Sequence, residues 1–496
     1  MQKNDIILLA FCAVCDGGTE IVKYMATTII TKEQWAESER FLTKLKEINI
    51  RFAQERGRAR LAHTETYGCQ QNVNDTERIR GMLKRAGFEF TDDAKEADLV
   101  ICNTCAVREN AEQRVFGRLG ILKHIKETRP EMLVAVCGCM VQQEHITEKI
   151  KKVHNHVDLI FGTHALYRMP ELLYRTITEK KTVVDITDSD GAICEDVPIL
   201  RDKEEKAWVS VMYGCNNFCT YCIVPYVRGR ERSRKPEDII NEIKGLVANG
   251  TSEISLLGQN VNSYGKDLET DIDFSDLLRM VNDIPGVERI RFMTSHPKDI
   301  SDKLIYTIRD CDKICKQLHL PLQSGSDKIL KDMNRHYTKE QYLNIVDKLK
   351  KEIPDITLTT DIIVGFPTET TPDFKETLDV LKRVRYDNIF SFIYSRREGT
   401  PAAKLDFVLS DEEIHKNFEE MLEIQNQICL EKNIEYKDKI QTVLVEDVSD
   451  TEPTILTGRN DGGKLVTFAG DASLKGKYVK VKITKPKQWS LEGELQ

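Results

Sequence analysis

The sequence predicts an α/β protein with three successive folded units: an open parallel sheet, a partial barrel of six strand–helix units, and a small antiparallel β-barrel. Short apolar runs alternate with helical segments from residue 61 onward, as in parallel sheets connected by helical crossovers. A polar segment at 188–206 interrupts this alternation and separates the first unit from the second. After residue 436 the chain changes to short strands joined by turns, which is typical of a small β-barrel.

Length and composition are those of a multidomain globular protein. The chain has 496 residues, of which 40% are hydrophobic and 31% are charged. Its apolar runs stay shorter than the ~18 residues that span a membrane, so we expect a soluble protein with no membrane contact. The net charge of −8 does not favour a nucleic-acid partner unless basic residues gather on one face. Fourteen cysteines, several at metal-ligand spacings, indicate the reducing cytoplasm.

Residues 1–60 are expected to form a helical extension without chemistry of its own. The apolar run at 6–14 mimics the core of a signal peptide, but a small-residue cleavage site does not follow it. Met25 is an alternative start of the protein. An amphipathic helix is expected before residue 60. Its apolar face carries Trp35, Phe41, Leu45 and Ile48.

Residues 61–195 are predicted to form the open-sheet domain. Three of its expected strands end in a cysteine: Cys69, Cys105 and Cys139. Because the carboxyl ends of parallel strands lie along one edge of a sheet, these thiols are expected to converge there and to bind a metal centre. The alternative is that they are buried thiols which pack as small apolar groups. We prefer that alternative for Cys102 and Cys137, which lie inside strands.

Residues 205–435 are predicted to form the partial barrel. Its first strand is followed by Cys215, Cys219 and Cys222, in a Cys-x3-Cys-x2-Cys spacing. A closed structural zinc site needs four ligands, and no fourth ligand follows. Three thiolates can instead hold an iron-sulfur cluster and leave one iron open. The loops at the carboxyl ends of the strands are where such barrels carry their active sites.

Other strand ends of the same barrel bring further groups to this face. They are Gln259, Asn260, Ser295, His296, 323–326, Gly365 and 395–397. Each of them is a weak signal alone, and a single histidine such as His296 is more often a hydrogen-bonded loop residue than a ligand. Their shared position at the carboxyl face is what favours a role in the site.

Residues 436–496 are predicted to form the small β-barrel. Seven lysines lie between residues 464 and 487 against a single acid, Asp471. Lys480 and Lys482 alternate along a strand and therefore share one face. We prefer nucleic-acid contact over a merely solvated surface for this face.

Taken together, these motifs resemble the radical S-adenosylmethionine superfamily, and the order of units from residue 61 to the C-terminus is similar to its methylthiotransferase family. The resemblance implies that Cys215, Cys219 and Cys222 hold a [4Fe-4S] cluster whose open iron binds S-adenosylmethionine, the radical source and methyl donor. It implies an auxiliary [4Fe-4S] cluster on Cys69, Cys105 and Cys139, and a C-terminal TRAM RNA-binding module. The implied cofactor contacts are Tyr221, which would meet the adenine, Gln259, Gln323 and Ser324.

The segments ETYGCQQN, LLGQNVNSYG, YCIVPYVRGRERSR and YSRREGTPAA are most similar to the family members that act on tRNA. The implied reaction is methylthiolation of C2 of N6-isopentenyladenosine at position 37, beside the anticodon. The implied partners are the tRNA anticodon loop and an electron donor such as flavodoxin or ferredoxin, with the chain as a monomer. Two departures from the family pattern are Gln71, in place of methionine, and residues 396–398, in place of a turn with proline.

Four arginines follow the barrel cysteines closely: Arg228, Arg230, Arg232 and Arg234. They could hold RNA phosphates near the reacting carbon. They could equally pair inside the protein with Glu231, Glu237 or Asp238. The sequence favours neither interpretation.

Three alternative functions remain open from the sequence. Two keep the chemistry and change the target, to N6-threonylcarbamoyladenosine in tRNA or to an aspartate of a ribosomal protein. The third is a non-catalytic iron-sulfur protein that binds RNA.

Overall fold

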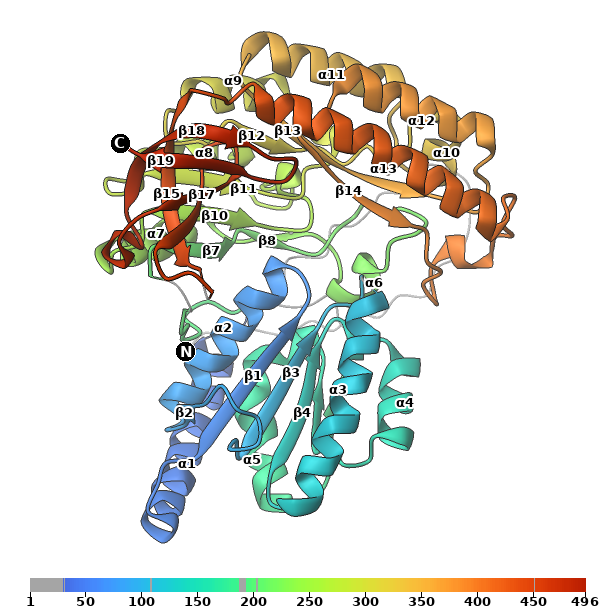
Figure 1. Ribbon diagram of the computed structural model, residues 1–496. Helices are drawn as coiled ribbons and strands as arrows, with labels where there is room; N and C mark the ends of the chain where they lie inside the picture. The colour runs from blue at the N-terminus through green and yellow to red at the C-terminus, as the bar shows by residue number, and fades with distance from the viewer. Residues whose placement is uncertain (1–29, 31, 108, 187–192, 202–203, 450) are drawn as a thin grey trace, which may run out of the picture.

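The computed structural model describes residues 30, 32–107, 109–186, 193–201, 204–449 and 451–496. The apolar run at 6–14 and the alternative start at Met25 lie outside the described residues. Figure 1 shows an N-terminal α/β unit on one side, the partial barrel on the other, and the small barrel at one end of the partial barrel. Among the helices within the described ranges, none combines the length and the apolar character needed to cross a bilayer.

The N-terminal unit is a parallel six-stranded sheet with the order β2-β1-β3-β4-β5-β6. Its strands are β1 (Leu61–Tyr67), β2 (Glu89–Phe90), β3 (Leu99–Thr104), β4 (Leu133–Gly138), β5 (Leu159–Phe161) and β6 (Val183–Asp185). Its helices are α1 (Lys32–Arg56), α2 (Gln70–Arg85), α3 (Glu109–Thr128), α4 (Glu144–Val153) and α5 (Met169–Glu179). One apolar core joins α1, α2 and α5 to one face of the sheet, and a second joins α3 and α4 to the other. The expected open α/β sheet is confirmed.

Helix α1 belongs to the N-terminal core, so the expectation of a separate extension was wrong. Trp35, Leu42 and Leu45 are buried in the same cluster as the strand residue Ala62. The ring of Phe41 packs on Tyr174 of α5 with 5.4 Å between the ring centroids. The apolar stripe of α1 therefore has a partner, because it packs on α5 and α2, the helices that cover this face of the sheet.

The partial barrel has six parallel strands, as the sequence predicts. They are β7 (Lys206–Ser210), β10 (Glu253–Leu257), β11 (Arg289–Phe292), β12 (Gln317–His319), β13 (Thr357–Val364) and β14 (Asn388–Ile393). They form two three-stranded sheets, linked by an isolated parallel bridge between Ile290 and Ile314. The outer helices are α7 (Pro236–Ala248), α8 (Phe274–Asn282), α9 (Asp302–Asp310), α10 (Asp327–Asp332), α11 (Lys339–Glu352) and α12 (Thr371–Val384). Between β7 and α7 lie the short elements β8 (Met212–Tyr213), α6 (Val224–Arg228) and β9 (Arg232–Ser233).

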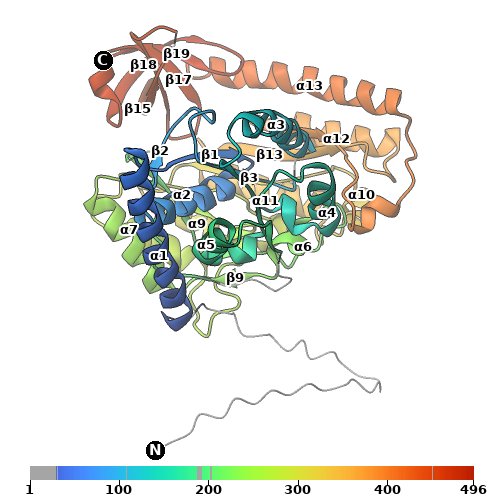
Figure 2. The same ribbon diagram turned by 90° about the horizontal axis from the view of Figure 1, so that it is seen from below.

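The long helix α13 (Asp411–Ile434) leads from the partial barrel to the small barrel, as Figure 2 shows. The small barrel is closed, with the strand order β15-β16-β17-β19-β18. Its strands are β15 (Ile440–Val448), β16 (Ile455–Arg459), β17 (Leu465–Ala469), β18 (Tyr478–Pro486) and β19 (Leu491–Leu495). Four of its strand pairs are antiparallel, but β17 and β19 pair in parallel, which corrects the expectation of a wholly antiparallel barrel.

The small barrel is fixed to the amino ends of the strands of the partial barrel. Arg289, the first residue of β11, donates to the carbonyl oxygens of Arg459 at 3.0 Å and of Thr442 at 2.7 Å. Lys206, the first residue of β7, pairs with Glu446 at 2.8 Å. The small barrel therefore lies at the end of the partial barrel that is opposite to the carboxyl ends of the partial barrel's strands.

Replacing Leu45 by alanine is expected to lower the free energy of unfolding by about 2 to 5 kcal/mol, because it opens a cavity in the N-terminal core. Leu45 is 1% exposed. The matched control is Ile50→Ala on the same helix, where the side chain is 50% exposed. The midpoint of urea unfolding, followed by tryptophan fluorescence to which Trp35 contributes, measures both. Equal midpoints for the two variants would show that α1 is not part of the core.

Candidate active site

The N-terminal cysteine set (Cys69, Cys105 and Cys139) gathers at the carboxyl edge of the first sheet. Cys69 is the N-cap of α2, Cys105 follows β3 directly, and Cys139 follows β4 directly. Cys69 and Cys105 are hydrogen-bonded to each other. A side chain at Gly68 would stand 2.8 Å from Cβ of Cys105, so this close approach needs glycine. The predicted convergence of these three residues is therefore present in the structure.

Hydrogen-bond donors lie beside the sulfur atoms of this set, although donation to Cys69 and burial raise the pKa of Cys105. The Cys105 thiol donates to Cys69 and lowers the pKa of Cys69 to about 6. The N–H of Val107 donates to Sγ of Cys105 at 3.2 Å. Burial raises the pKa of Cys139, and the neighbouring Arg228 guanidinium opposes that effect. The set therefore has donors in place for ligated thiolates.

The barrel cysteine set (Cys215, Cys219 and Cys222) lies in the loop between β8 and α6. Gly214, with φ of 76°, makes the turn into this loop. Asn334 anchors the loop through its side-chain amide, which donates to the carbonyl oxygens of Asn217 at 3.2 Å and Phe218 at 3.1 Å. Burial raises the pKa of Cys215 to about 12, and it also raises the pKa of Cys222.

A buried arginine contacts the barrel set as well. Arg335 follows α10 and is 4% exposed. Its Nη1 lies 3.5 Å from Sγ of Cys219, and its Nη2 donates to the carbonyl oxygen of Pro321 at 2.9 Å. No local pattern signals this contact, because Arg335 lies 116 residues beyond Cys219.

Each cysteine set supplies three thiols, which is the number that holds an iron-sulfur cluster with one iron left open. Within the described ranges, no group of three or more His, Cys, Asp or Glu side chains is arranged to hold one metal ion. Burial holds most of these thiols protonated, and binding iron would release their protons.

The predicted cofactor contacts take different places. Tyr221 packs against an apolar cluster that includes Ile329 and Met333. The side-chain oxygen of Gln259 accepts the N–H of Gly214 at 2.5 Å, so it holds the cysteine loop. Ser324 is completely buried, and its hydroxyl lies 3.4 Å from that of Thr377.

Gln323 is a strand-end residue with φ of 69°. Its N–H donates to the carbonyl oxygen of Asp361 at 2.8 Å, and it is 6% exposed. Gln259 and Ser324 have these partners within the protein, and both stay predicted cofactor contacts. Tyr221 and Gln323 stay predictions.

Three of the four arginines after the barrel cysteines are buried, which corrects the hypothesis that they contact phosphates. Arg228 pairs with Asp75 at 2.8 Å. Arg232 donates to the carbonyl oxygens of Arg228 and Arg230. Arg234 pairs with Glu195 at 2.6 Å and with Glu242 at 2.7 Å. These partners differ from the three acids that the sequence suggested, and only Asp75 and Glu195 come from distant segments.

Arg230 is the exposed member of the four. Its guanidinium lies over the ring of Phe218, 4.4 Å from the ring centroid. It is therefore the one arginine of this group that stays a predicted RNA contact. Lys480 and Lys482 lie outside the core of the small barrel, whereas Val481 and Ile483 between and beside them are fully buried in it.

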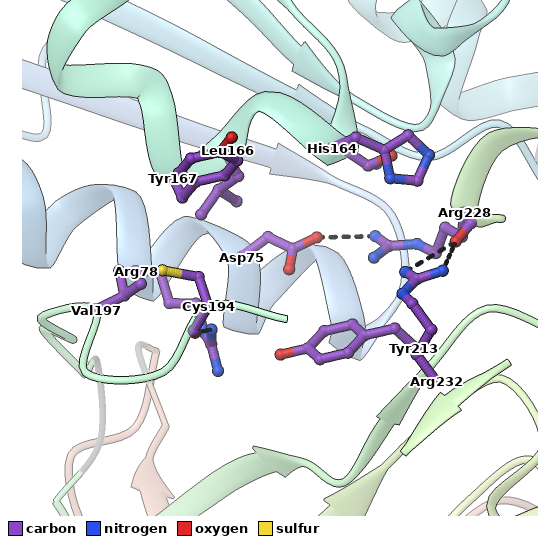
Figure 3. Close-up of a pocket in the computed structure, with 11 residues that line it drawn as sticks. Asp75, Arg78, His164, Leu166, Tyr167, Cys194, Val197, Tyr213, Arg228 and Arg232 are labelled. Carbon is purple, nitrogen blue, oxygen red and sulfur yellow. Dashed lines mark hydrogen bonds and ion pairs between the residues drawn. The ribbon is translucent and has the colours of Figure 1, made fainter. Parts of the chain in front are cut away.

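A polar cavity of about 50 Å³ lies between the N-terminal unit and the partial barrel. Figure 3 shows Asp75 of α2 and Arg228 pointing toward each other across it. His164 lines the same cavity, and burial, with Arg232 and Arg228 nearby, lowers the pKa of His164 to about 4. At this size the cavity holds a few water molecules and cannot hold a nucleobase.

The residues that depart from the family pattern make contacts between the two units. The side-chain amide of Gln71 donates to Asp75 at 3.1 Å and to the Ser210 hydroxyl of β7 at 3.0 Å. Arg397 donates to the carbonyl oxygen of Val107, beside Cys105, at 2.9 Å. Both departures therefore lie where the barrel meets the N-terminal cysteine set.

Comparisons with known proteins agree with this architecture. The radical SAM superfamily model matches residues 209–381, the model of uncharacterized protein family UPF0004 matches 60–162, and the TRAM domain model matches 435–496. The solved structure of the radical S-adenosylmethionine methyltransferase TsrM from Kitasatospora setae, with cobalamin and a [4Fe-4S] cluster bound, has a similar fold. It is 14% identical with a TM-score of 0.51, covering 70% of this chain and 77% of that one. Fold and cysteine loop thus define a radical SAM protein.

Relatives narrow the assignment within that class. The tRNA-2-methylthio-N(6)-dimethylallyladenosine synthase of Acetivibrio thermocellus is 56% identical over 466 residues, covering 94% of this chain and 97% of that protein. The synthase of the same name from Clostridioides difficile is 54% identical over 464 residues, covering 93% and 97%. The chain belongs to the family of tRNA-2-methylthio-N6-dimethylallyladenosine synthases, and the resemblance read from its motifs is confirmed.

Replacing Arg234 by alanine is expected to cost about 3 kcal/mol of stability, because it leaves two carboxylates without their buried partner. The side chain of Arg234 is 3% exposed. The control is Arg230→Ala, an exposed arginine of the same segment, for which a change below about 0.5 kcal/mol is expected. Urea unfolding followed by circular dichroism compares the two. A larger loss for the Arg230 variant would contradict the assigned burial.

Proposed function

We propose that this chain methylthiolates C2 of N6-isopentenyladenosine at position 37 of tRNA, giving 2-methylthio-N6-dimethylallyladenosine. The observation that carries the proposal is the presence of two separate three-cysteine sets at one boundary between two units. The names of the relatives support the same substrate. A [4Fe-4S] cluster with an open iron, together with bound S-adenosylmethionine, supplies a 5′-deoxyadenosyl radical, and a second S-adenosylmethionine supplies the methyl group.

The two cysteine sets are proposed to hold two clusters with different tasks. The barrel set would hold the cluster that binds S-adenosylmethionine, because its loop lies at the carboxyl face of the barrel strands. The N-terminal set would hold the auxiliary cluster that provides the sulfur. Helix α6 links the two, since Ile223 and Val227 pack on Ala106 and Cys139. The chain thus keeps both clusters at one site while giving each its own ligands.

The RNA would be held at two places. An anticodon-loop base leaves its stack cheaply, so the target base can be presented to a buried site. Arg230, near the barrel cysteine set, would contact a phosphate close to that base. Lys480 and Lys482 on the small barrel would hold the backbone further away. Because the small barrel contacts the amino ends of the barrel strands, the bound tRNA would extend along the partial barrel.

The remaining partners follow from the chemistry. Radical formation consumes an electron, so the proposal includes a reducing protein such as flavodoxin or ferredoxin. All cysteines within the described ranges are free thiols, which suits a reducing cytoplasm. The chain is proposed to act as a monomer.

Two single substitutions test the division of labour. Cys219→Ala is expected to abolish formation of 5′-deoxyadenosine, because it removes a ligand of the cluster that binds S-adenosylmethionine. Cys105→Ala is expected to permit that cleavage but to stop methylthiolation. Anaerobic assays with isopentenylated tRNA, read by chromatography and mass spectrometry, measure both products. Equal loss of cleavage in the two variants would falsify separate roles.

Mass analysis of tRNA nucleosides, with and without the gene, tests the target. Loss of 2-methylthio-N6-dimethylallyladenosine alone is expected, with N6-isopentenyladenosine accumulating in its place. Loss of the methylthiolated threonylcarbamoyl nucleoside would instead identify N6-threonylcarbamoyladenosine as the target. If tRNA kept all of its methylthio groups without the gene, an aspartate of a ribosomal protein would be favoured as the target.

Replacing Lys480 and Lys482 together by alanine is expected to weaken tRNA binding and to lower the slope of log affinity against log salt by about 1.5 to 2. Lost phosphate contacts release fewer counterions, which is why the slope falls. The control is Lys351→Ala, an exposed lysine on α11, away from the small barrel. Filter binding at several salt concentrations measures the slopes. An unchanged slope in the double variant would remove the small barrel from the RNA interface.

A further inference from the structure

Arg228 makes a contact that neither the sequence nor the proposed reaction assigns. Its Nε donates to Sγ of Cys139 at 3.1 Å, and its Nη2 donates to Asp75 at 2.8 Å. The side chain is only 7% exposed. A guanidinium in this position is charged at every accessible pH, so it places a permanent positive charge beside the N-terminal cysteine set.

Three segments fix this arrangement. Arg228 is the last residue of α6, six positions after Cys222 of the barrel set. Asp75 lies on α2, six positions after Cys69, and accepts a hydrogen bond from Gln71 at 3.1 Å. The hydroxyl of Thr163 donates to the carbonyl oxygen of Val227 at 2.7 Å and anchors the end of α6. The guanidinium therefore cannot swing away without breaking its contacts with Asp75 and Cys139 across the boundary.

The charges explain why an arginine is suited to this place. Burying a lone cation is costly, and the carboxylate of Asp75 neutralises the charge of the Arg228 guanidinium but no further charge. Figure 3 shows the guanidinium facing that carboxylate. Its Nε donates to Sγ of Cys139, which the figure does not draw. Further negative charge at the cysteine set is therefore stabilised by Arg228 and disfavoured by Asp75. Electron gain by a cluster held there adds such a charge.

We propose that Arg228 is a positioning residue that raises the reduction potential of the auxiliary cluster, with Asp75 as the opposing charge. This proposal rests on the proposed function, which places a cluster on Cys69, Cys105 and Cys139. Hydrogen bonds to ligating sulfur and nearby positive charge both favour the reduced state of such a cluster. Arg335 has the corresponding position at the barrel set, with its longer contact of 3.5 Å to Cys219.

The test uses the full-length chain with Cys215, Cys219 and Cys222 replaced by alanine, so that only the auxiliary cluster is present. A redox titration followed by electron paramagnetic resonance gives its midpoint potential. Arg228→Met is expected to lower the potential, because it removes a donor and a positive charge. Asp75→Asn is expected to raise it, because it removes a negative charge. Arg234→Met is the matched control: an equally buried arginine that pairs with Glu195 and Glu242 and is expected to leave the potential unchanged.

Opposite shifts in the Arg228 and Asp75 variants would support the proposal, because a merely structural role does not predict opposite signs. Coincident potentials in the reference, Arg228 and Asp75 proteins, with iron content intact, would overturn it and leave the proposed function standing. If Arg228→Met fails to fold, a lowered or unchanged potential in Asp75→Asn would still overturn the proposal. Absence of iron from the reference protein would overturn the two-cluster function and this proposal with it.

Discussion

The structure depends on one constraint, which is that parallel strands joined by helical crossovers bring all their carboxyl ends to the same edge. The N-terminal sheet and the partial barrel are both built this way, and α6 lies where the two meet (Figure 1). Residues as distant in sequence as Cys69, Cys139 and Cys222 consequently serve one region. A fold with antiparallel strands would have spread these thiols over both ends of its sheets.

Desolvation is the main cost of this arrangement. Three arginines of the segment after Cys222 are buried at the boundary. Arg228 and Arg234 pair with carboxylates of other segments, and Arg232 donates to carbonyl oxygens of its own segment. Buried ion pairs add little net stability, but losing one partner is expensive. Their effect is therefore to fix the two units in a single relative position. A fixed position is what a reaction needs when two cofactors on different units act on one carbon atom.

Much of this could be predicted from the sequence because its signals are local. Cysteine spacing and strand–helix alternation identify the two cysteine sets and the order of the units. Very short strands, such as β2 with two residues and β6 with three, carry too little pattern to be detected. The parallel pairing of β17 with β19 depends on barrel closure and has no local signal.

Burial of charged residues has no local signal either. The sequence left phosphate contact and internal pairing equally open for Arg228 and Arg234, because pairing with Asp75, Glu195 and Glu242 depends on the fold. Likewise α1 reads as an appendage until its packing on α5 and α2 is known. Long-range pairing, rather than residue type, decides these cases.

We propose that one chain holds two clusters on two independent sets of ligands. Iron and sulfide content of the anaerobically reconstituted full-length protein is the measurement that tests this proposal. We expect about eight iron atoms per chain, and about four when either cysteine set is replaced by alanine, since each set would hold a four-iron cluster. About four iron atoms in the unsubstituted protein, or loss of all iron on removing one set, would contradict it.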